Sequence, residues 1–355
     1  MGFELEKLLR PHILQIKPYS SARDEYTGKV GIFLDANENP YGALTGEPFN
    51  RYPDPYQADI KEKLAPVKGV AKEQIFLGNG SDEAIDLLMR AFCVPGKDNI
   101  ILLPPTYGMY EVSASINDIA IKRVNLTTDF QLRTSAILEA VDENSKIIFI
   151  CSPNNPSGNK MDRNAIREII QKFHGLVVVD EAYIDFSDEP SFTTELGHYP
   201  NLLVMQTFSK AWGLANLRIG MAFASEKIIR ILNLIKPPYN ISGLTQQKVL
   251  ETLEKADQLE ALVKEVMKER VMLVEALDDL SFVLECYPSH ANFVLVKMDH
   301  AQKIYEYLIH EMIIVRDRSK VVLCEDCLRI SVGTQEENTL LIEALTRYEP
   351  IIKNL

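Results

Sequence analysis

Short apolar runs alternate with amphipathic stretches between about residues 75 and 225. After Ser81, apolar residues recur at the spacing of one helix face, at Ile85, Leu88, Met89 and Phe92. The apolar runs are almost continuous and rich in β-branched residues, as is typical of strands buried on both faces. They cover residues 100–103, 147–151, 176–179, 202–206 and 219–224. This alternation predicts an α/β fold with a mostly parallel sheet and helices on both faces.

The pattern changes after the proline and glycine cluster at residues 237–243. Residues 244–287 contain neither glycine nor proline and have the pattern of a long, charged amphipathic helix. The rest of the chain mixes helices with shorter strand-like runs, which predicts a smaller α+β unit. We expect its strands at residues 281–285, 293–297, 321–323 and 328–332. The last helix should start with Thr334 and Glu337, which have capping-box spacing, and should end before Pro350.

The charge pattern argues against nucleic acid and membrane partners. The 355-residue chain carries 38 Lys and Arg against 50 Asp and Glu, a net charge of −12, and no segment gathers basic residues into a stripe. Its apolar runs are far shorter than the ~20 residues that cross a bilayer, and the first residues lack a signal-peptide pattern. Five dispersed cysteines fit a reducing compartment better than a disulfide framework. We therefore expect a cytoplasmic protein.

Polar residues stand directly after the apolar runs, where parallel strands end and ligands bind. Asp180 follows the run 176–179, and a buried carboxylate is costly unless it is paired. An internal salt bridge is one explanation of this residue, and a Mg²⁺ ligand in a nucleotide-binding site is another. The second explanation needs a phosphate loop. The nearest match, at Gly96 and Lys97, continues with Asp98 instead of Ser or Thr.

Lys210 offers a third explanation of Asp180. It lies just past the run 202–206, after Ser209 and eight residues before Arg218. A lysine amine forms a Schiff base with an aldehyde, and a carboxylate keeps a pyridine nitrogen protonated. The pair therefore predicts pyridoxal phosphate as the cofactor of an enzyme, whereas Lys210 considered alone would be interpreted as a solvated loop lysine.

Such a cofactor also needs a phosphate site, a stacking group for its ring and a donor to its ring hydroxyl. The backbone N–H groups of Ser81 and Asp82, at the start of a predicted helix, are suited to phosphate. The Ser209 hydroxyl and the Arg218 guanidinium are suited to the same group. The candidates for the ring follow other strand ends and are Tyr107 for stacking, and Asn155 and Tyr183 for the ring oxygen.

Together these segments resemble the fold-type I pyridoxal-phosphate-dependent aminotransferases. The motifs that carry the resemblance are SPNNPSG (152–158), VVVDEAY (177–183), TFSK (207–210) and Arg218. Further segments narrow it to the histidinol-phosphate aminotransferase family and extend it over about residues 19–333. They are LDANENPYG (34–42), RYPDP (51–55), GSDEAIDLLMRAF (80–92), PPTYGMY (104–110), KPPYNIS (236–242) and CLRISVGT (327–334).

The resemblance implies a fold, an assembly and a reaction. The fold is that of aspartate aminotransferase, with an N-terminal arm (1–30) packing with the small domain, a large cofactor-binding domain (31–245), and a linking helix with a small C-terminal domain (246–355). The assembly is a homodimer with a shared active site. The reaction transfers an amino group between L-histidinol phosphate and 2-oxoglutarate in a ping-pong cycle of histidine biosynthesis, giving imidazole-acetol phosphate and L-glutamate.

The resemblance also assigns roles to residues of this sequence. Lys210 is implied to be the Schiff-base lysine, with Asp180 at the pyridine nitrogen and Tyr183 as the third catalytic residue. The other implied cofactor contacts are Tyr107 on the ring, Asn155 with Tyr183 at the ring hydroxyl, Ser81, Asp82, Ser209 and Arg218 at the phosphate, and Tyr52 from the other subunit. The implied substrate contacts are Asn155, Arg329 at a carboxylate, and Arg316 and Tyr19 at the substrate phosphate.

Other functions remain as alternatives at this point. An aromatic aminotransferase and a decarboxylase of phosphorylated amino acids would share the same fold and cofactor residues. Lys210 argues against a non-catalytic binding protein, and the missing phosphate loop argues against an ATPase. Cys324 and Cys327 have C-x-x-C spacing, but no further ligands follow at the spacing of a zinc site, so we expect no metal.

Overall fold

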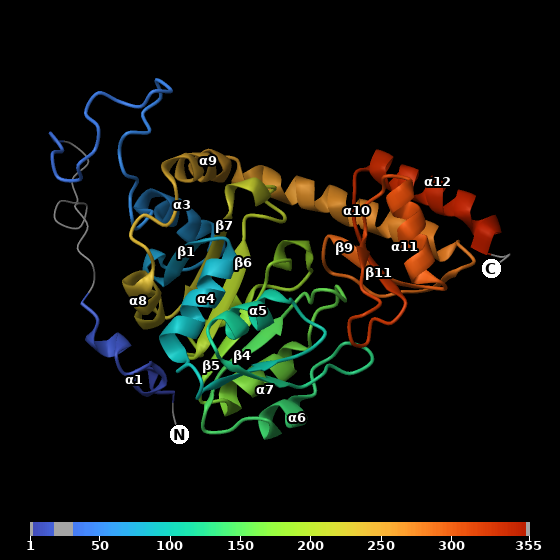
Figure 1. Cartoon of the computed structure of the whole chain (residues 1–355), viewed down its shortest axis with the longest axis horizontal. Helices are drawn as coiled ribbons and strands as arrows, with labels where there is room; N and C mark the ends of the chain where they lie inside the picture. Colours follow the sequence, from blue (N-terminus) through green and yellow to red (C-terminus); the bar gives the residue numbers. More distant parts are fainter. Residues whose placement is uncertain (1–2, 18–30, 353–355) are drawn as a thin grey trace.

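The computed structural model describes residues 3–17 and 31–352 and contains two sheets (Figure 1). The larger sheet has seven strands in the order β1-β7-β6-β5-β4-β2-β3. Only β7 runs antiparallel to its neighbours, so the predicted mostly parallel sheet is confirmed. Its strands are β1 (Ile75–Asn79), β2 (Asn99–Leu102), β3 (Ala120–Arg123), β4 (Ser145–Cys151), β5 (Leu176–Asp180), β6 (Leu202–Thr207) and β7 (Ile219–Ala224).

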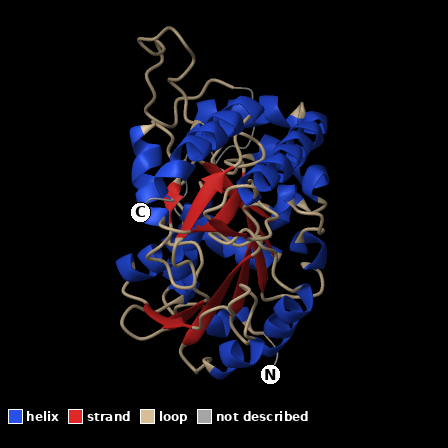
Figure 2. Cartoon of the chain, turned by 90° about the vertical axis from the view of Figure 1, so that its right-hand side faces the viewer, coloured by secondary structure: helices blue, strands red, loops and turns tan. Residues whose placement is uncertain are grey.

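The central strands of this sheet are buried on both faces, which explains their continuous apolar runs. Along β5, Val177 and Val179 join one apolar cluster, while Leu176 and Val178 join the other. Helices cover both faces (Figure 2). One face carries α3 (Ala58–Lys68), α6 (Thr134–Glu139), α7 (Arg163–Lys172) and α9 (Gly243–Leu253). The other carries α4 (Ser81–Phe92), α5 (Met109–Ile116) and α8 (Glu226–Ile235).

The described part of the N-terminal arm, residues 3–17, packs with the large domain. Leu5 and Leu8 of α1 (Leu5–Leu8) are buried in the same apolar cluster as α4, and the Arg10 N–H donates to the Ala91 carbonyl at 3.0 Å. The packing of the whole arm (1–30) with the small domain remains a prediction. The short 3₁₀ turns of the chain are Ile13–Gln15, Lys72–Gln74, Ile184–Phe186, Phe192–Glu195, Ala215–Leu217 and Ala256–Gln258.

The C-terminal part forms a four-stranded antiparallel sheet in the order β10-β11-β9-β8. Helices packed on this sheet bury a separate apolar cluster, as the predicted smaller α+β unit requires. The division of the chain at residues 30 and 245 remains a prediction. The elements are α10 (Leu259–Asp278), β8 (Val283–Cys286), β9 (Phe293–Met298), α11 (Ala301–His310), β10 (Arg316–Asp317), β11 (Cys327–Ser331) and α12 (Gln335–Ile352).

Three local predictions in this part are wrong. Residues 244–287 do not form one helix: α9 ends at Leu253, a turn and the 3₁₀ segment Ala256–Gln258 follow, and α10 runs from Leu259 to Asp278 before β8 begins. Residues 321–323 are not a strand but successive turns, closed by bonds such as Cys324 N–H to Val321 carbonyl, at 2.9 Å. The helix α12 begins at the expected Thr334–Glu337 capping box but continues past Pro350, because a proline near a helix end removes a single hydrogen bond.

No helix among the described residues is long and apolar enough to cross a membrane.

Candidate active site

The ends of the central strands, together with the first residues of α4, enclose a cavity. It lies where a mostly parallel sheet places ligands, at the carboxyl ends of its strands. Nine residues predicted to contact the cofactor line it together. The lining residues are Ser81, Asp82, Tyr107, Cys151, Asn155, Asp180, Ala182, Tyr183, Thr207, Ser209, Lys210 and Arg218. No role was predicted for Cys151 and Thr207, which line the cavity because they are the last residues of β4 and β6.

Asp180 is a buried carboxylate that has hydrogen-bond donors but no cation as a partner. Its Oδ1 accepts a hydrogen bond from the Ala182 N–H at 3.1 Å, and its Oδ2 accepts one from the Tyr110 hydroxyl. Burial raises the pKa of Asp180 to about 6, against the lowering effect of these two bonds. None of the lysines and arginines in residues 3–17 and 31–352 forms an ion pair with it, so the carboxylate fits a bound cationic group such as a pyridinium.

Lys210 reaches the same cavity from the loop after β6. Its Nζ lies 5.6 Å from the centre of the Tyr183 ring. Partial desolvation and the charge of Arg329 lower the pKa of Lys210, while Asp180 opposes this shift. A lysine with a lowered pKa has a larger neutral fraction, which is the form that attacks a carbonyl carbon.

The first turn of α4 and the loop before β7 form an anion-binding corner. The start of β7 can approach the first turn of α4 closely because Gly220 has no side chain: a Cβ atom there would lie 2.2 Å from the Ser81 nitrogen. The Arg218 Nη2 lies 3.4 Å from Asp82 Oδ2, and the Tyr107 hydroxyl donates to Asp82 Oδ1 at 3.1 Å. The helix N–H groups beside a guanidinium suit a phosphate group. This match in residue chemistry supports the predicted phosphate contacts of the cofactor.

The smaller sheet contributes Arg329 to the site. Its Nη1 donates to the Asn155 Oδ1 at 2.6 Å, and the Asn155 Nδ2 donates to the Tyr183 hydroxyl at 3.3 Å. The Arg329 guanidinium also lies over the Phe293 ring, 5.1 Å from its centre. This chain of contacts joins the two sheets directly beside the cavity.

Two further arginines lie near Arg329: Arg316 on the adjacent strand β10, and Arg318 in the loop just after it. Arg316 pairs with Arg329 in the β10–β11 register and is exposed. Arg318 was missed by the sequence analysis, although its spacing of two from Arg316 would place both on one face of a strand. Burial and the charge of Arg316 lower the pKa of Arg318, and its Nε has no hydrogen-bond partner among the described residues. Such clustered cations suit a doubly charged anion.

Of the predicted cofactor contacts, Tyr52 does not line the cavity of its own chain. The Tyr52 ring stacks on Tyr239 with ring centres 4.5 Å apart, and both line a different hollow. This placement neither supports nor opposes a contact across a subunit interface. Tyr19 lies outside the described residues.

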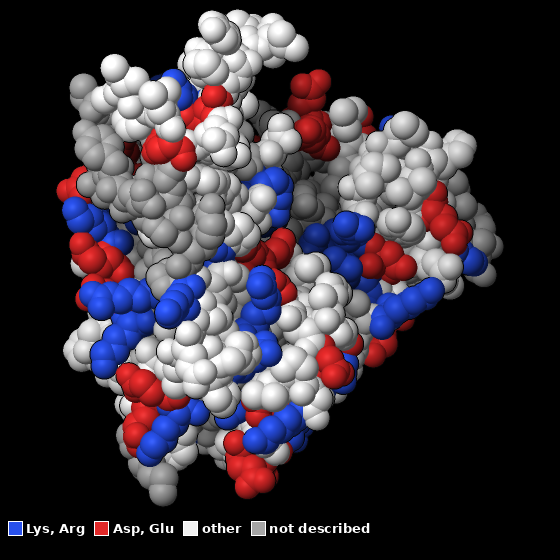
Figure 3. All heavy atoms as spheres, turned by 60° about the vertical axis from the view of Figure 1, so that its left-hand side comes forward, with Lys and Arg blue, Asp and Glu red and all other residues white. Residues whose placement is uncertain are grey.

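Lysine and arginine side chains border the hollow between the two lobes of the molecule (Figure 3).

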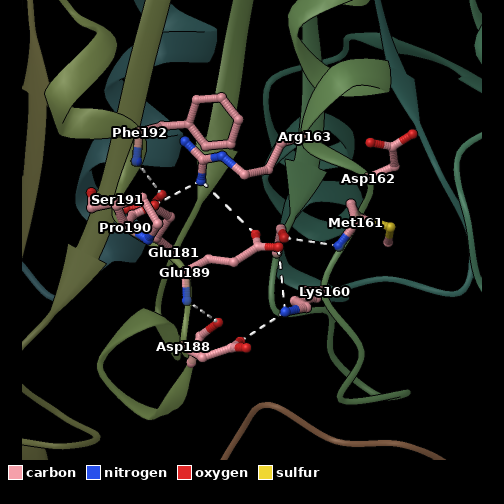
Figure 4. Close-up of polar contacts among 12 residues, drawn as sticks. Lys160, Met161, Asp162, Arg163, Glu181, Asp188, Glu189, Pro190, Ser191 and Phe192 are labelled. Atoms are coloured by element: carbon pink, nitrogen blue, oxygen red, sulfur yellow. Dashed lines mark hydrogen bonds and ion pairs between the residues drawn. The ribbon is translucent and has the colours of Figure 1, made fainter.

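The segment that follows Asp180 is anchored by a buried acid and by ion pairs (Figure 4). Glu181 Oε1 accepts a hydrogen bond from the Phe192 N–H at 2.7 Å. The Arg163 guanidinium lies 3.9 Å from the centre of the Phe192 ring, and Lys160 Nζ lies 2.7 Å from Asp188 Oδ1. Burial raises the pKa of Glu181 to about 7. These contacts hold the loop that carries Tyr183 without lining the cavity themselves.

The described residues contain no group of three His, Cys, Asp or Glu side chains that could hold a metal ion. Cys324 and Cys327 are buried free thiols inside an apolar cluster. Burial raises the pKa of each thiol to about 12.

Comparison with known proteins agrees with this geometry. The sequence profile of "Aminotransferase class I and II" matches residues 27–345. The histidinol-phosphate aminotransferase of Cytophaga hutchinsonii is 56% identical to this chain over 98% of it and 100% of the relative, and that of Bacteroides fragilis is 55% identical over 97% and 99%.

Solved structures share the fold. The histidinol-phosphate aminotransferase of Sinorhizobium meliloti in complex with pyridoxal-5'-phosphate superposes with a TM-score of 0.80 at 23% identity, covering 96% of this chain and 97% of that one. The aspartate aminotransferase of Thermotoga maritima superposes with a TM-score of 0.74 at 21% identity, covering 85% and 84%. Together with the cavity that contains Lys210 and Asp180, the sequence matches show that the chain belongs to the pyridoxal-phosphate-dependent class I and II aminotransferases and, among them, to the histidinol-phosphate aminotransferases.

Proposed function

We propose that this enzyme transfers the amino group between L-histidinol phosphate and 2-oxoglutarate, as a step of histidine biosynthesis. The products are imidazole-acetol phosphate and L-glutamate, formed in a ping-pong cycle. The observation that carries the proposal is one cavity that combines Lys210, an unpaired buried Asp180 and, at its edge, a cluster of arginines around Arg329. The names of the relatives at more than 50% identity support the choice of substrate.

Each residue of the cavity has a chemical task in this proposal. Bound pyridoxal phosphate supplies an aldehyde carbon for amine exchange and a ring that takes up electrons. Lys210 would hold the cofactor through its Nζ and would act as the base that takes up the proton of the substrate carbon. Asp180 would keep a proton at the ring nitrogen.

The remaining residues orient the cofactor and exclude water from it. Tyr107 would stack on the ring, and Asn155 with Tyr183 would donate to its hydroxyl oxygen. The phosphate would lie in the corner between the first turn of α4 and Arg218, where the Thr207 hydroxyl accepts from the Ser209 N–H at 3.0 Å and fixes that loop. The phosphate contacts would be Ser81, Asp82, Ser209 and Arg218.

The absorbance spectrum of the purified protein tests this function. A yellow band that changes to the pyridoxamine spectrum on adding histidinol phosphate, with no keto acid present, would support both the cofactor and the first half-reaction. If the band responds to phenylalanine but not to histidinol phosphate, the aminotransferase stands and the substrate is wrong. Release of carbon dioxide from a phosphorylated amino acid would favour the decarboxylase alternative.

The arginines predict a difference between the two substrates. Arg316→Ala should raise KM for histidinol phosphate about tenfold, because a charge-assisted contact to the phosphate is lost. KM for 2-oxoglutarate should change less than about twofold, because its carboxylate relies on Arg329. Steady-state kinetics with each substrate measures both values, and Arg230→Ala, at an exposed pair with Glu226 on α8, is the matched control. An equal rise for both substrates would remove Arg316 from the phosphate site.

A homodimer is part of the proposal. The segment around residues 31–50 extends from the body of the chain (Figure 1) and exposes large apolar side chains, with relative exposures of 92% for Ile32, 88% for Leu34 and 97% for Tyr41. Contiguous exposed apolar groups of this kind mark association surfaces. A second copy of this chain would cover them and would place Tyr52 at the neighbouring cofactor phosphate.

Mixing a weakened variant with an inactive one tests the shared site. Tyr52→Ala should lower activity about tenfold by removing a hydrogen bond to the phosphate, and Lys210→Ala should be inactive. After the two variants are unfolded together and refolded, hybrid dimers contain one site with both residues intact, so activity should recover above that of either variant. Activity that stays at the mean of the two separate preparations would place Tyr52 in its own chain's site or outside any site.

A cytoplasmic location is also proposed. It rests on the five cysteines, which are all free thiols in the structure, as a reducing compartment maintains them.

A further inference from the structure

Tyr110 lies beside the cavity, and its hydroxyl interacts with two residues of the cavity lining, Asp180 and Cys151. It is the second residue of α5, and its side chain is completely buried. The ring stacks on Phe149 of β4, with ring centres 4.6 Å apart, and meets the edge of Tyr107 at 5.5 Å. The hydroxyl donates a hydrogen bond to Asp180 Oδ2. Tyr110 does not line the cavity, so it acts on the site only through its neighbours.

The environment of Asp180 shows what this bond does. The carboxylate is surrounded by apolar strand residues, and burial favours its neutral form. The hydrogen bonds from Tyr110 and from the Ala182 N–H oppose this effect by stabilising the charged form. The charged groups that face it are Asp82, which favours protonation, and Lys210, which opposes it. The pKa of Tyr110 is itself raised well above its usual range, so the hydroxyl keeps its proton and always donates.

We propose that Tyr110 is a positioning residue that keeps Asp180 ionised and turned toward the cavity, so that the proton shared with the cofactor stays on the ring nitrogen. This inference rests on the proposed role of Asp180 at that nitrogen. Without the hydroxyl, the carboxylate binds the proton more tightly and the ring loses its positive charge. The ring then takes up electrons less well when a proton leaves the substrate carbon.

Tyr110→Phe removes only the hydroxyl and keeps the packed ring. The matched control is Tyr307→Phe, which removes a hydroxyl that donates to the Ala344 carbonyl at 3.1 Å in the smaller α+β unit. Each variant is loaded with pyridoxal phosphate or with an analogue that has carbon in place of the ring nitrogen. Stopped-flow absorbance then gives the single-turnover rate with histidinol phosphate or, if that substrate gives no turnover, with glutamate.

With pyridoxal phosphate, Tyr110→Phe should react about tenfold more slowly than the unmodified enzyme, the usual effect of losing a hydrogen bond to a charged group. The pH midpoint of the cofactor's visible band should rise by about one unit, because less positive charge remains beside the nitrogen that joins Lys210 to the cofactor. With the analogue, the unmodified enzyme and Tyr110→Phe should react at the same, slower rate. Tyr307→Phe should match the unmodified enzyme in every measurement.

The outcomes distinguish a failure of this inference from a failure of the proposed function on which it rests. An unchanged rate and midpoint in Tyr110→Phe with pyridoxal phosphate would overturn the inference alone. A tenfold loss that persists with the analogue would also overturn it, because the hydroxyl would then act through packing and not through the ring nitrogen. If the unmodified enzyme reacts equally fast with both cofactors, the role proposed for Asp180 fails and the inference fails with it.

Discussion

Lys210→Ala should lower kcat by about 10⁴-fold or more, because one amine performs both the covalent attachment and the proton transfer in this site. Lys210 is the lysine that lines the cavity, and its lowered pKa fits both tasks. The side chain faces the cavity and makes no ion pair among the described residues, so its removal should leave folding intact. Single-turnover absorbance with histidinol phosphate measures the loss, and thermal unfolding measures the stability.

The control for this variant is Lys248→Ala. Lys248 is an exposed lysine of α9 paired with Glu251 at 2.7 Å and is not part of the cavity lining, so its removal should leave kcat unchanged. Partial rescue of Lys210→Ala by an added small primary amine would support the proton-transfer task. A Lys210→Ala enzyme that turns over at a near-normal rate would contradict the mechanism.

Asp180→Asn should lower the single-turnover rate about 10²- to 10³-fold, because a fixed charge opposite the reacting ring is lost while the shape of the side chain is kept. The amide still accepts a hydrogen bond through its oxygen but cannot carry a negative charge. The ring nitrogen would then lose the partner that keeps its proton. The same stopped-flow measurement gives the rate, and the band position of the bound cofactor reports its protonation.

Glu181→Gln is the matched control for Asp180→Asn, since it makes the same acid-to-amide change at the next residue. Glu181 is also fully buried, and its Oε2 accepts a hydrogen bond from the Gln206 Nε2 at 3.0 Å, but it does not line the cavity. We expect a rate within about threefold of the unmodified enzyme, with the effect limited to stability. Equal losses in the two variants would mean that Asp180 acts through the fold and not through its charge.

The site was largely predictable from local sequence because its residues follow apolar runs. Strands buried on both faces must be continuously apolar, and a polar residue at the end of such a run must face a ligand or a partner. Asp180 and Lys210 were identified in this way, and both line the cavity. Tyr110 and Arg318 were not found, because one lies inside an ordinary amphipathic helix and the other in a short loop, where tyrosine and arginine are common.

The errors in the fold have a shared origin. Residues 244–287 were expected to form one helix but form α9 and α10, and residues 321–323 were expected to form a strand but form turns. In both cases the local pattern identifies an apolar segment but contains no information about its partner. The choice depends on which apolar surface lies within reach once the rest of the chain has folded.

Periodicity and motifs of a few neighbouring residues were enough to predict the class of the fold, the cofactor chemistry and the family. Contacts between remote residues became visible in the packed chain: Arg329, which is 174 residues from Asn155 along the chain, donates to it, and the Tyr110 hydroxyl donates to the Asp180 carboxylate. Hydrogen bonds and charge effects act over a few ångströms. Distances of that size between remote segments exist only after the sheets and helices have packed.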